Sequence, residues 1–290
     1  MDFIIMTDSS CDLPLSYIEE NNIPFVSLTC HFNNSDYKDD FGKTFTYRQF
    51  YDGLRNGEMP TTSQVNVYQF TEVFTKFIKE GKSIIYIGMS SAISGTINSA
   101  NMAKESVLEE YKDADITIID SKSACIGQGI LVYNAVEMMK KGCSREEIIK
   151  WVENNKLNIN HWFMVGTLKH LRYGGRISAT AATIGTLMKI NPIIFINNEG
   201  KLINVTNVRG RKKAIKYLLE KFEERAKEPE NQIIMISHGD CVEDATNLER
   251  TVKEEFGVKD TMINFVGPVI ASHTGPDMLS LCFIGNGRDL

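Results

Sequence analysis

The first half of the chain alternates short apolar runs with helical patterns, and this alternation restricts the folds open to it. The apolar runs are rich in Ile and Val and are bounded by polar or turn residues: FIIM (3–6), IPFVSLTCHF (23–32), SIIYIG (83–88) and ITIID (116–120). We interpret them as buried strands. Between them, apolar residues recur at helical spacing from Phe70 to Ile78, and a capping box at Ser144 begins a further helix. Strands that alternate with helices predict a parallel, doubly wound sheet.

The second half has a different pattern, in which two strands follow one another directly. PIIFIN (192–197) and KLINV (201–205) are separated only by a turn-like Asn-Glu-Gly, which predicts an antiparallel hairpin. Helices are predicted over 214–222 and 242–256, and strands over 233–237, 261–266 and 279–285. We therefore expect an α/β chain of two domains. The first is an N-terminal parallel-sheet α/β domain over 1–165, and the second is a smaller C-terminal α/β domain over 166–290 with a largely antiparallel sheet.

Composition and charge exclude several classes of function. The 290 residues include 32 Lys and Arg against 37 Asp and Glu, and a net charge of −5 argues against nucleic acid as a partner. No apolar run is long enough to span a membrane and no basic leader is present, so we expect a cytoplasmic protein with at most transient contact with a membrane surface. The six Cys and five His show no metal-ligand spacing, and we expect no metal site.

Hydroxyl-rich segments follow three of the predicted parallel strands, at 7–10, 90–96 and 120–123. Ligands of open α/β folds bind beyond the carboxyl ends of the strands, so we expect these loops to face one crevice. The alternative is that each Ser, Thr or Asp only caps the next helix. Ser94-Gly95-Thr96 opens a helix, where amides and hydroxyls can hold a carboxylate or phosphate.

Nucleotide-binding motifs do not fit these loops. Gly88 and Gly95 lack the spacing of a P-loop, and Thr96 stands where that motif needs Lys. Gly127-Gln128-Gly129 lacks the third glycine of a dinucleotide fingerprint. We therefore expect neither ATP nor NAD, and no other cofactor, in this chain.

A serine hydrolase or esterase of small acyl substrates remains an alternative. GMSSA (88–92) approaches the GxSxG motif with Ser90 as nucleophile, and His273 follows later in the chain. Ala92 replaces the last glycine, however, and no acid is evident between Ser90 and His273. His273 lies in a predicted turn, SHTGP (272–276), which favours a functional role over a core histidine.

Two basic segments lie in the second half. Residues 171–177 form a predicted turn that carries Arg172 and Arg176. Small residues over 178–186 follow, which permit close helix packing or leave room for an elongated ligand. Arg209 opens the cluster RGRKK (209–213), a pattern typical of solvated surface.

Seven segments in this order resemble the DegV family of bacterial fatty-acid-binding proteins, the carrier subunits of fatty acid kinase. The resemblance covers essentially the whole chain. Its segments are TDSSCDLP (7–14), TTSQ (61–64), SSAISGT (90–96), DSKSACIGQG (120–129), TLKHLRYGGRIS (167–178), VRGRKKA (208–214) and SHTGP (272–276).

The resemblance implies a function as well as a fold. The two domains would enclose one long-chain fatty acid, such as palmitate, stearate or oleate. A separate ATP-dependent fatty acid kinase would phosphorylate its carboxylate, giving an acyl phosphate for phospholipid synthesis. The chain would be a carrier without activity alone. A regulatory or small-anion sensor is a third class, which predicts no chain-length preference.

The resemblance also implies roles for individual residues. Thr62 and Ser94, with Ser63 and Gly95 beside them, correspond to the residues that bind the carboxylate. Arg209 and His273 correspond to residues needed at phosphoryl transfer, and Arg172 and Arg176 to residues that help dock the kinase.

Overall fold

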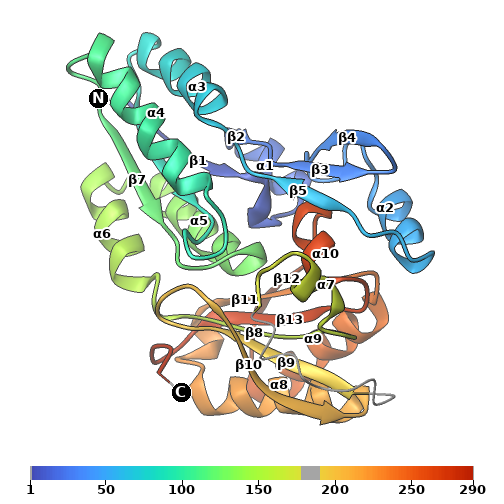
Figure 1. Cartoon of the computed structure of the whole chain (residues 1–290). Helices are drawn as coiled ribbons and strands as arrows, with labels where there is room; N and C mark the ends of the chain where they lie inside the picture. The colour runs from blue at the N-terminus through green and yellow to red at the C-terminus, as the bar shows by residue number, and fades with distance from the viewer. Residues whose placement is uncertain (1, 178–189, 290) are drawn as a thin grey trace.

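The N-terminal half is built on a parallel sheet in the strand order β2-β1-β6-β7. The computed structural model describes residues 2–177 and 190–289 (Figure 1). The strands are β1 (Phe3–Asp8), β2 (Phe25–Val26), β6 (Ser83–Gly88) and β7 (Ile116–Asp120). The pairings within this sheet are parallel, which confirms what the alternation of apolar runs and helices predicts.

Helices connect these strands and cover the sheet. α3 (Val67–Lys79) and α4 (Thr96–Glu110) pack against each other and against β6 and β7 (Figure 1). α1 (Leu15–Glu20) and α6 (Arg145–Asn155) complete this half, and α6 begins at the capping box predicted at Ser144. α5 (Cys125–Lys140) contacts β1 and β6 as well as strands of the second sheet. It therefore forms the layer between the two sheets.

The second sheet has six strands in the order β10-β9-β8-β13-β11-β12. Their bounds are β8 (Ile159–Met164), β9 (Ile190–Ile196), β10 (Leu202–Arg209), β11 (Ile233–His238), β12 (Asp260–Phe265) and β13 (Leu279–Ile284). Among the described residues of this six-stranded sheet, β11 pairs with β12 in parallel and the other neighbouring strands pair antiparallel. The predicted hairpin and the largely antiparallel sheet are thus confirmed. α8 (Arg211–Arg225) and α9 (Val242–Phe256) cover the face away from α5.

A third, small sheet contains β4 (Ser35–Lys38), β3 (Thr29–Phe32) and β5 (Thr61–Ser63) in this order. The apolar run 23–32, expected to be one strand, is divided: β2 joins the parallel sheet and β3 joins the small antiparallel one. This expectation is wrong because an apolar run predicts burial, whereas the pairing partner depends on contacts distant in sequence. α2 (Tyr47–Arg55) follows the small sheet and begins at a capping box on Thr46.

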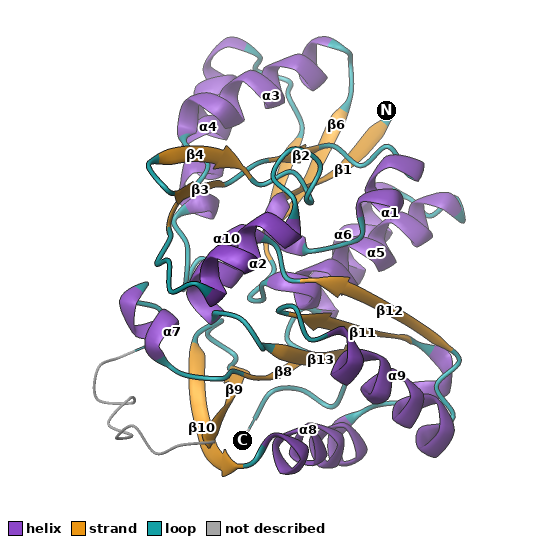
Figure 2. Cartoon of the chain, turned by 90° about the vertical axis from the view of Figure 1, so that its right-hand side faces the viewer, coloured by secondary structure: helices purple, strands orange, loops and turns teal. Residues whose placement is uncertain are grey.

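The chain enters the six-stranded sheet before the boundary expected after residue 165. β8 ends at Met164 and pairs with β9 and β13, so its hydrogen bonds place it with the C-terminal strands. α10 (Pro268–Thr274) reaches back to contact β3 and β5, and α7 (Lys169–Tyr173) packs beside α10 (Figure 2). Within the described ranges, no helix has the length and apolar character needed to cross a membrane.

Candidate functional site

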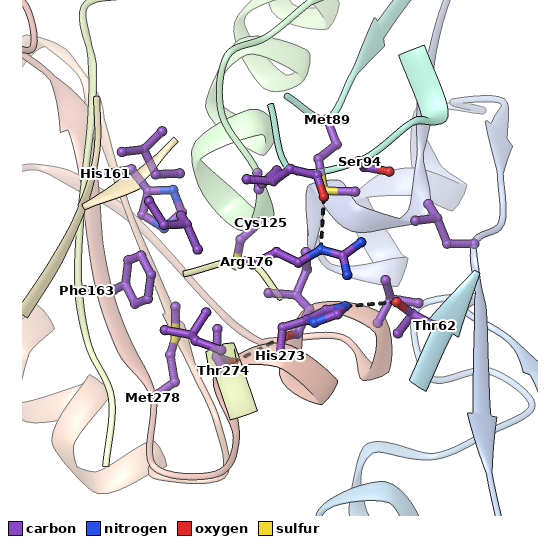
Figure 3. A pocket seen from close by; sticks show the side chains of 18 of the residues that line it. Thr62, Met89, Ser94, Cys125, His161, Phe163, Arg176, His273, Thr274 and Met278 are labelled. Carbon is purple, nitrogen blue, oxygen red and sulfur yellow. Dashed lines mark hydrogen bonds between the residues drawn. The ribbon is translucent and has the colours of Figure 1, made fainter. Parts of the chain in front are cut away.

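A cavity of about 320 Å³ lies where the small sheet, the parallel strands and the six-stranded sheet meet (Figure 3). Pockets for small molecules typically measure about 300–1,000 Å³. Most of the wall is apolar and comes from residues distant in sequence: Leu28, Met89, Ile93, Ala124, Phe163, Leu171, Ile196, Leu202, Val269, Ile270 and Met278. One side of the cavity, here called the polar end, carries Thr62, Ser94, Arg176 and His273. The cavity therefore suits a ligand with a polar head and an apolar body.

The polar end is centred on a hydrogen bond between Thr62 and His273. Thr62 Oγ1, on β5, lies 2.8 Å from His273 Nε2, on α10. The sequence predicts a turn at His273, but residues 268–274 form a short helix, because Pro268 is well suited to a first helical turn. Burial, followed by the charges of Arg176 and His170, lowers the pKa of His273 to about 4. The imidazole is therefore neutral at pH 7, with one donor and one acceptor nitrogen.

Arg176 and Ser94 complete the polar end. Arg176 Nε donates to the Ile93 carbonyl at 3.1 Å, which holds the guanidinium beside the loop before α4. Ser94 Oγ lies 2.9 Å from Thr96 Oγ1 and accepts from the Thr96 amide at 3.3 Å. In the described part of the chain, Arg176 is the one permanently charged residue that lines the cavity. Hydroxyls beside a single cation are groups that bind a carboxylate.

Two glycines allow the segments around the polar end to approach closely. A Cβ at Gly95, the N-cap of α4, would lie 2.2 Å from Gln64 Oε1. A Cβ at Gly174 would lie 1.9 Å from His273 Nδ1. Any other residue at Gly174 would displace the imidazole, so this glycine fixes where His273 sits.

Other predicted residues lie outside the polar end. Ser63 borders the cavity, but its hydroxyl is 2.5 Å from His31 Nε2, on the face of β5 opposite Thr62. Arg172 is exposed on α7. Arg209 is exposed at the end of the edge strand β10 and does not line the cavity, so the structure does not bring it together with His273. The predicted small-residue segment 178–186 falls outside the described residues.

The catalytic pair expected for a serine hydrolase does not form. The buried Ser90 hydroxyl donates to the Gly200 carbonyl at 3.0 Å, while His273 is hydrogen bonded to Thr62. Ser63, His31 and Asp36 do follow the order of a hydrolase triad, with His31 Nδ1 2.6 Å from Asp36 Oδ1. They lie on the exposed face of the small sheet, however, and not on the face that carries Thr62.

The three hydroxyl-rich loops contribute unequally to the cavity. The second loop (90–96) supplies Ser94 to the cavity wall. Ala124 and Cys125, which directly follow the third loop (120–123) in the sequence, also line the cavity. The first loop is structural, because Asp8 Oδ2 accepts from the Tyr86 hydroxyl at 2.7 Å and from the Met89 amide at 3.1 Å. Helix capping, the alternative to ligand binding, describes this loop, since Asp8 also caps a short 3-10 helix.

Sequence reasoning missed His161 and Phe163, which line the cavity from β8. Their neighbours Trp162 and Met164 point to the other face of the sheet and pack in the core beneath α8 and α9. Side chains alternate between the two faces of a strand, so His161 and Phe163 share one face of β8, but the run INHWFM (159–164) is buried throughout and does not indicate which face lines a cavity.

Comparisons with known proteins agree with this fold over its whole length. The family model described as "Uncharacterised protein, DegV family" matches residues 2–286. A DegV domain-containing protein of Clostridium perfringens is 46% identical over 287 residues, which cover 99% of both chains. A stearic acid-binding protein of Eubacterium ventriosum is similar in structure, with a TM-score of 0.88 and 28% identity over 98% of each chain. A fatty-acid-binding DegV family protein of Thermus thermophilus has a TM-score of 0.88 and 27% identity, covering 99% of this chain and 100% of its own. Since the family model and the relatives span nearly the whole sequence, the chain belongs to the DegV family.

Proposed function

We propose that this protein binds one long-chain fatty acid, with the carboxylate at Thr62 and Ser94 beside Arg176 and His273. The observation that carries the proposal is a cavity in which hydroxyls and one cation face walls of aliphatic and aromatic side chains. The relatives from Eubacterium ventriosum and Thermus thermophilus, described as binding stearic acid and fatty acid, support this class of ligand. Palmitate, stearate and oleate are the candidates.

The energetics of burial favour such a ligand. About 14 methylenes of a C16 chain, at ~0.8 kcal/mol each, contribute roughly 11 kcal/mol before ordering costs are subtracted. The carboxylate loses its hydration in the cavity, and charge-assisted hydrogen bonds from Thr62, Ser94 and Arg176 compensate for that loss.

The purified protein is expected to carry a single fatty acid per chain, because the apolar walls make release into water unfavourable. Native mass spectrometry gives the stoichiometry, and mass spectrometry of a lipid extract identifies the acid. Delipidated protein should take up octadecanoic acid and bind octadecanol more weakly, since the alcohol lacks a carboxylate. A lipid-free protein that takes up no fatty acid after delipidation contradicts the proposal.

We further propose that the carboxylate is presented to a separate, ATP-dependent fatty acid kinase in the cytoplasm, which forms an acyl phosphate for phospholipid synthesis. Arg176 lines the cavity and is also exposed, so the polar end can be reached from the surface that carries Arg172. The sequence has no P-loop motif, so in this proposal the kinase binds the ATP. Without that partner the chain is expected to be inactive.

Arg209→Ala and His273→Ala are each expected to retain bound fatty acid and to lose acyl phosphate formation by about tenfold or more, or about 1.4 kcal/mol of barrier. Groups that interact with charge developing in the transition state raise the rate without raising affinity. Because Arg209 lies outside the cavity, its contribution would require the complex with the kinase. Acyl phosphate formed with kinase and ATP is measured beside the lipid content of each variant. Lys212→Ala, in the same basic cluster, is the matched control. Normal turnover in both variants, or loss of the lipid, contradicts this assignment.

A further inference from the structure

His161 is a buried polar side chain in an otherwise apolar part of the cavity. It lies beside Phe163 on β8, is 2% exposed, and lines the cavity across from Thr62 (Figure 3). Within residues 2–177 and 190–289, no donor or acceptor of the chain reaches either of its ring nitrogens. An unpaired buried polar group destabilises a fold, so a histidine in this wall requires an explanation that a leucine would not.

A second unpaired polar group lies close to His161. The buried Ser123 Oγ also has no hydrogen-bond partner in the part of the chain that the structure describes. Gly127 marks where the two groups meet, because a Cβ at this position would lie 2.7 Å from Ser123 Oγ and 2.8 Å from His161 Nδ1. Ser123 Oγ, from the loop after β7, and His161 Nδ1, from β8, therefore lie on the same side of Gly127, and of these two His161 is the one that lines the cavity.

Both groups lie beside the start of α5, whose third residue is Gly127. This 16-residue helix begins at Cys125, and no side chain of the described residues caps it. Ala124 and Cys125 both line the cavity. The first amides of a helix have no acceptor within the helix and lie at its positive end, so they favour an oxygen acceptor. The proposed carboxylate site gives no role to the DSKSACIGQG motif (120–129), which builds these features.

A ligand oxygen beside these groups must be uncharged. Burial, and to a lesser extent the charge of Arg288, lowers the pKa of His161 to about 3, so the ring is neutral. Arg288 does not line the cavity, and it donates to the Ile159 carbonyl at 2.7 Å and the Lys156 carbonyl at 2.8 Å. A carboxylate buried here would therefore lack a paired cation. A hydroxyl can donate and accept, as can a neutral imidazole and a serine hydroxyl, and all three can be satisfied together.

We propose that His161, Ser123 and the first turn of α5 form an inner subsite that binds a hydroxyl or keto oxygen on the acyl chain. The protein is then a carrier that prefers an oxygenated fatty acid to the plain one of equal length. This inference rests on the proposed function, because the carboxylate must lie at Thr62 and Ser94 for the chain to reach His161. The distance between the two ends of the cavity selects the position of the oxygen along the chain.

The test compares octadecanoic acid with hydroxyoctadecanoic acids that differ only in the carbon bearing the hydroxyl. Each displaces a fluorescent fatty acid from the delipidated full-length protein. One isomer is expected to bind about tenfold more tightly than octadecanoic acid, as a well-placed hydrogen bond provides. The other isomers should bind more weakly, because their hydroxyl is buried without a partner. In His161→Phe the preference should vanish while octadecanoic acid still binds, and Ser123→Ala should reduce it.

Phe163→Leu is the matched control, because it alters the neighbouring wall residue without removing a polar group and should affect all these ligands alike. The comparison of ligands in the native protein does not depend on the folding of any variant. If octadecanoic acid binds and every hydroxylated isomer binds more weakly, the inner subsite is overturned and the fatty-acid carrier stands. A preference that survives in both His161→Phe and Ser123→Ala also overturns it. If no fatty acid binds at all, the proposed function fails and the inner subsite fails with it.

Discussion

Thr62→Val and Ser94→Ala are each expected to weaken fatty-acid binding by about 1.5–3 kcal/mol, the range for hydrogen bonds to charged groups. Valine keeps the shape of threonine but offers no hydroxyl to the carboxylate or to His273 Nε2, which lies 2.8 Å from Thr62 Oγ1. Alanine at position 94 leaves the start of α4 without its hydroxyl, which the Thr96 amide contacts. Displacement of a fluorescent fatty acid from the delipidated proteins measures both losses.

Thr61→Val is the matched control for this experiment. Thr61 precedes Thr62 on β5, and because side chains alternate along a strand, its side chain lies on the face opposite Thr62. On β3 its partner in the register is His31. Thr61→Val should leave the affinity for fatty acid unchanged, whereas Thr62→Val should weaken it. Unchanged affinity in both Thr62→Val and Ser94→Ala would place the carboxylate elsewhere in the cavity.

Much of the fold follows from local sequence. The runs SIIYIG and ITIID form β6 and β7 with the predicted bounds, and the helix predicted over 242–256 is α9. These elements are predictable because periodicity and caps act over a few residues. The run 23–32 shows the limit of such reasoning, since its division between two sheets depends on strands that come much later in the chain.

The polar end of the cavity depends on contacts that no local pattern contains. Thr62 and His273 are 211 residues apart and meet because α10 reaches back to the small sheet. Motifs indicate each of these residues singly, but not that they are hydrogen bonded. Arg209 belongs to an equally clear motif, yet it lies outside the cavity lining. His161 has no motif, because a histidine within an apolar strand has the same sequence pattern whether it faces a core or a ligand.

Two buried carboxyl groups hold the start of α10, the helix that carries His273. The Gly267 amide donates to Asp12 Oδ1 at 3.0 Å, and the Val269 amide donates to Asp39 Oδ2 at 3.4 Å. Each carboxyl group has one oxygen without a partner among residues 2–177 and 190–289. Since Asp12 and Asp39 belong to the N-terminal half, these bonds connect that half to the polar end of the cavity.

The melting temperature of the lipid-free protein is therefore expected to fall as the pH rises from 5 to 8. Burial, followed by the charges of Asp40 and Asp8, raises the pKa of Asp39 from 3.8 to about 7. Burial also raises the pKa of Asp12. Between the two pKa values of Asp39, the folded chain holds a proton that the unfolded chain has released. The contribution of Asp39 to stability is thus lost as the pH rises, by about 1.4 kcal/mol per unit, and the loss of this contribution levels off above pH 7.

Asp39→Asn is expected to remove most of this pH dependence and to raise the melting temperature at pH 8. Asparagine has nearly the shape of a protonated aspartate, and its side-chain oxygen can still accept from the Val269 amide, but it has no proton to lose. Asp113→Asn, an exposed substitution, is the control and should leave the pH profile unchanged. A native protein with a constant melting temperature from pH 5 to 8, or an unchanged slope in Asp39→Asn, would show that the proton on Asp39 does not contribute to the stability of the junction at α10.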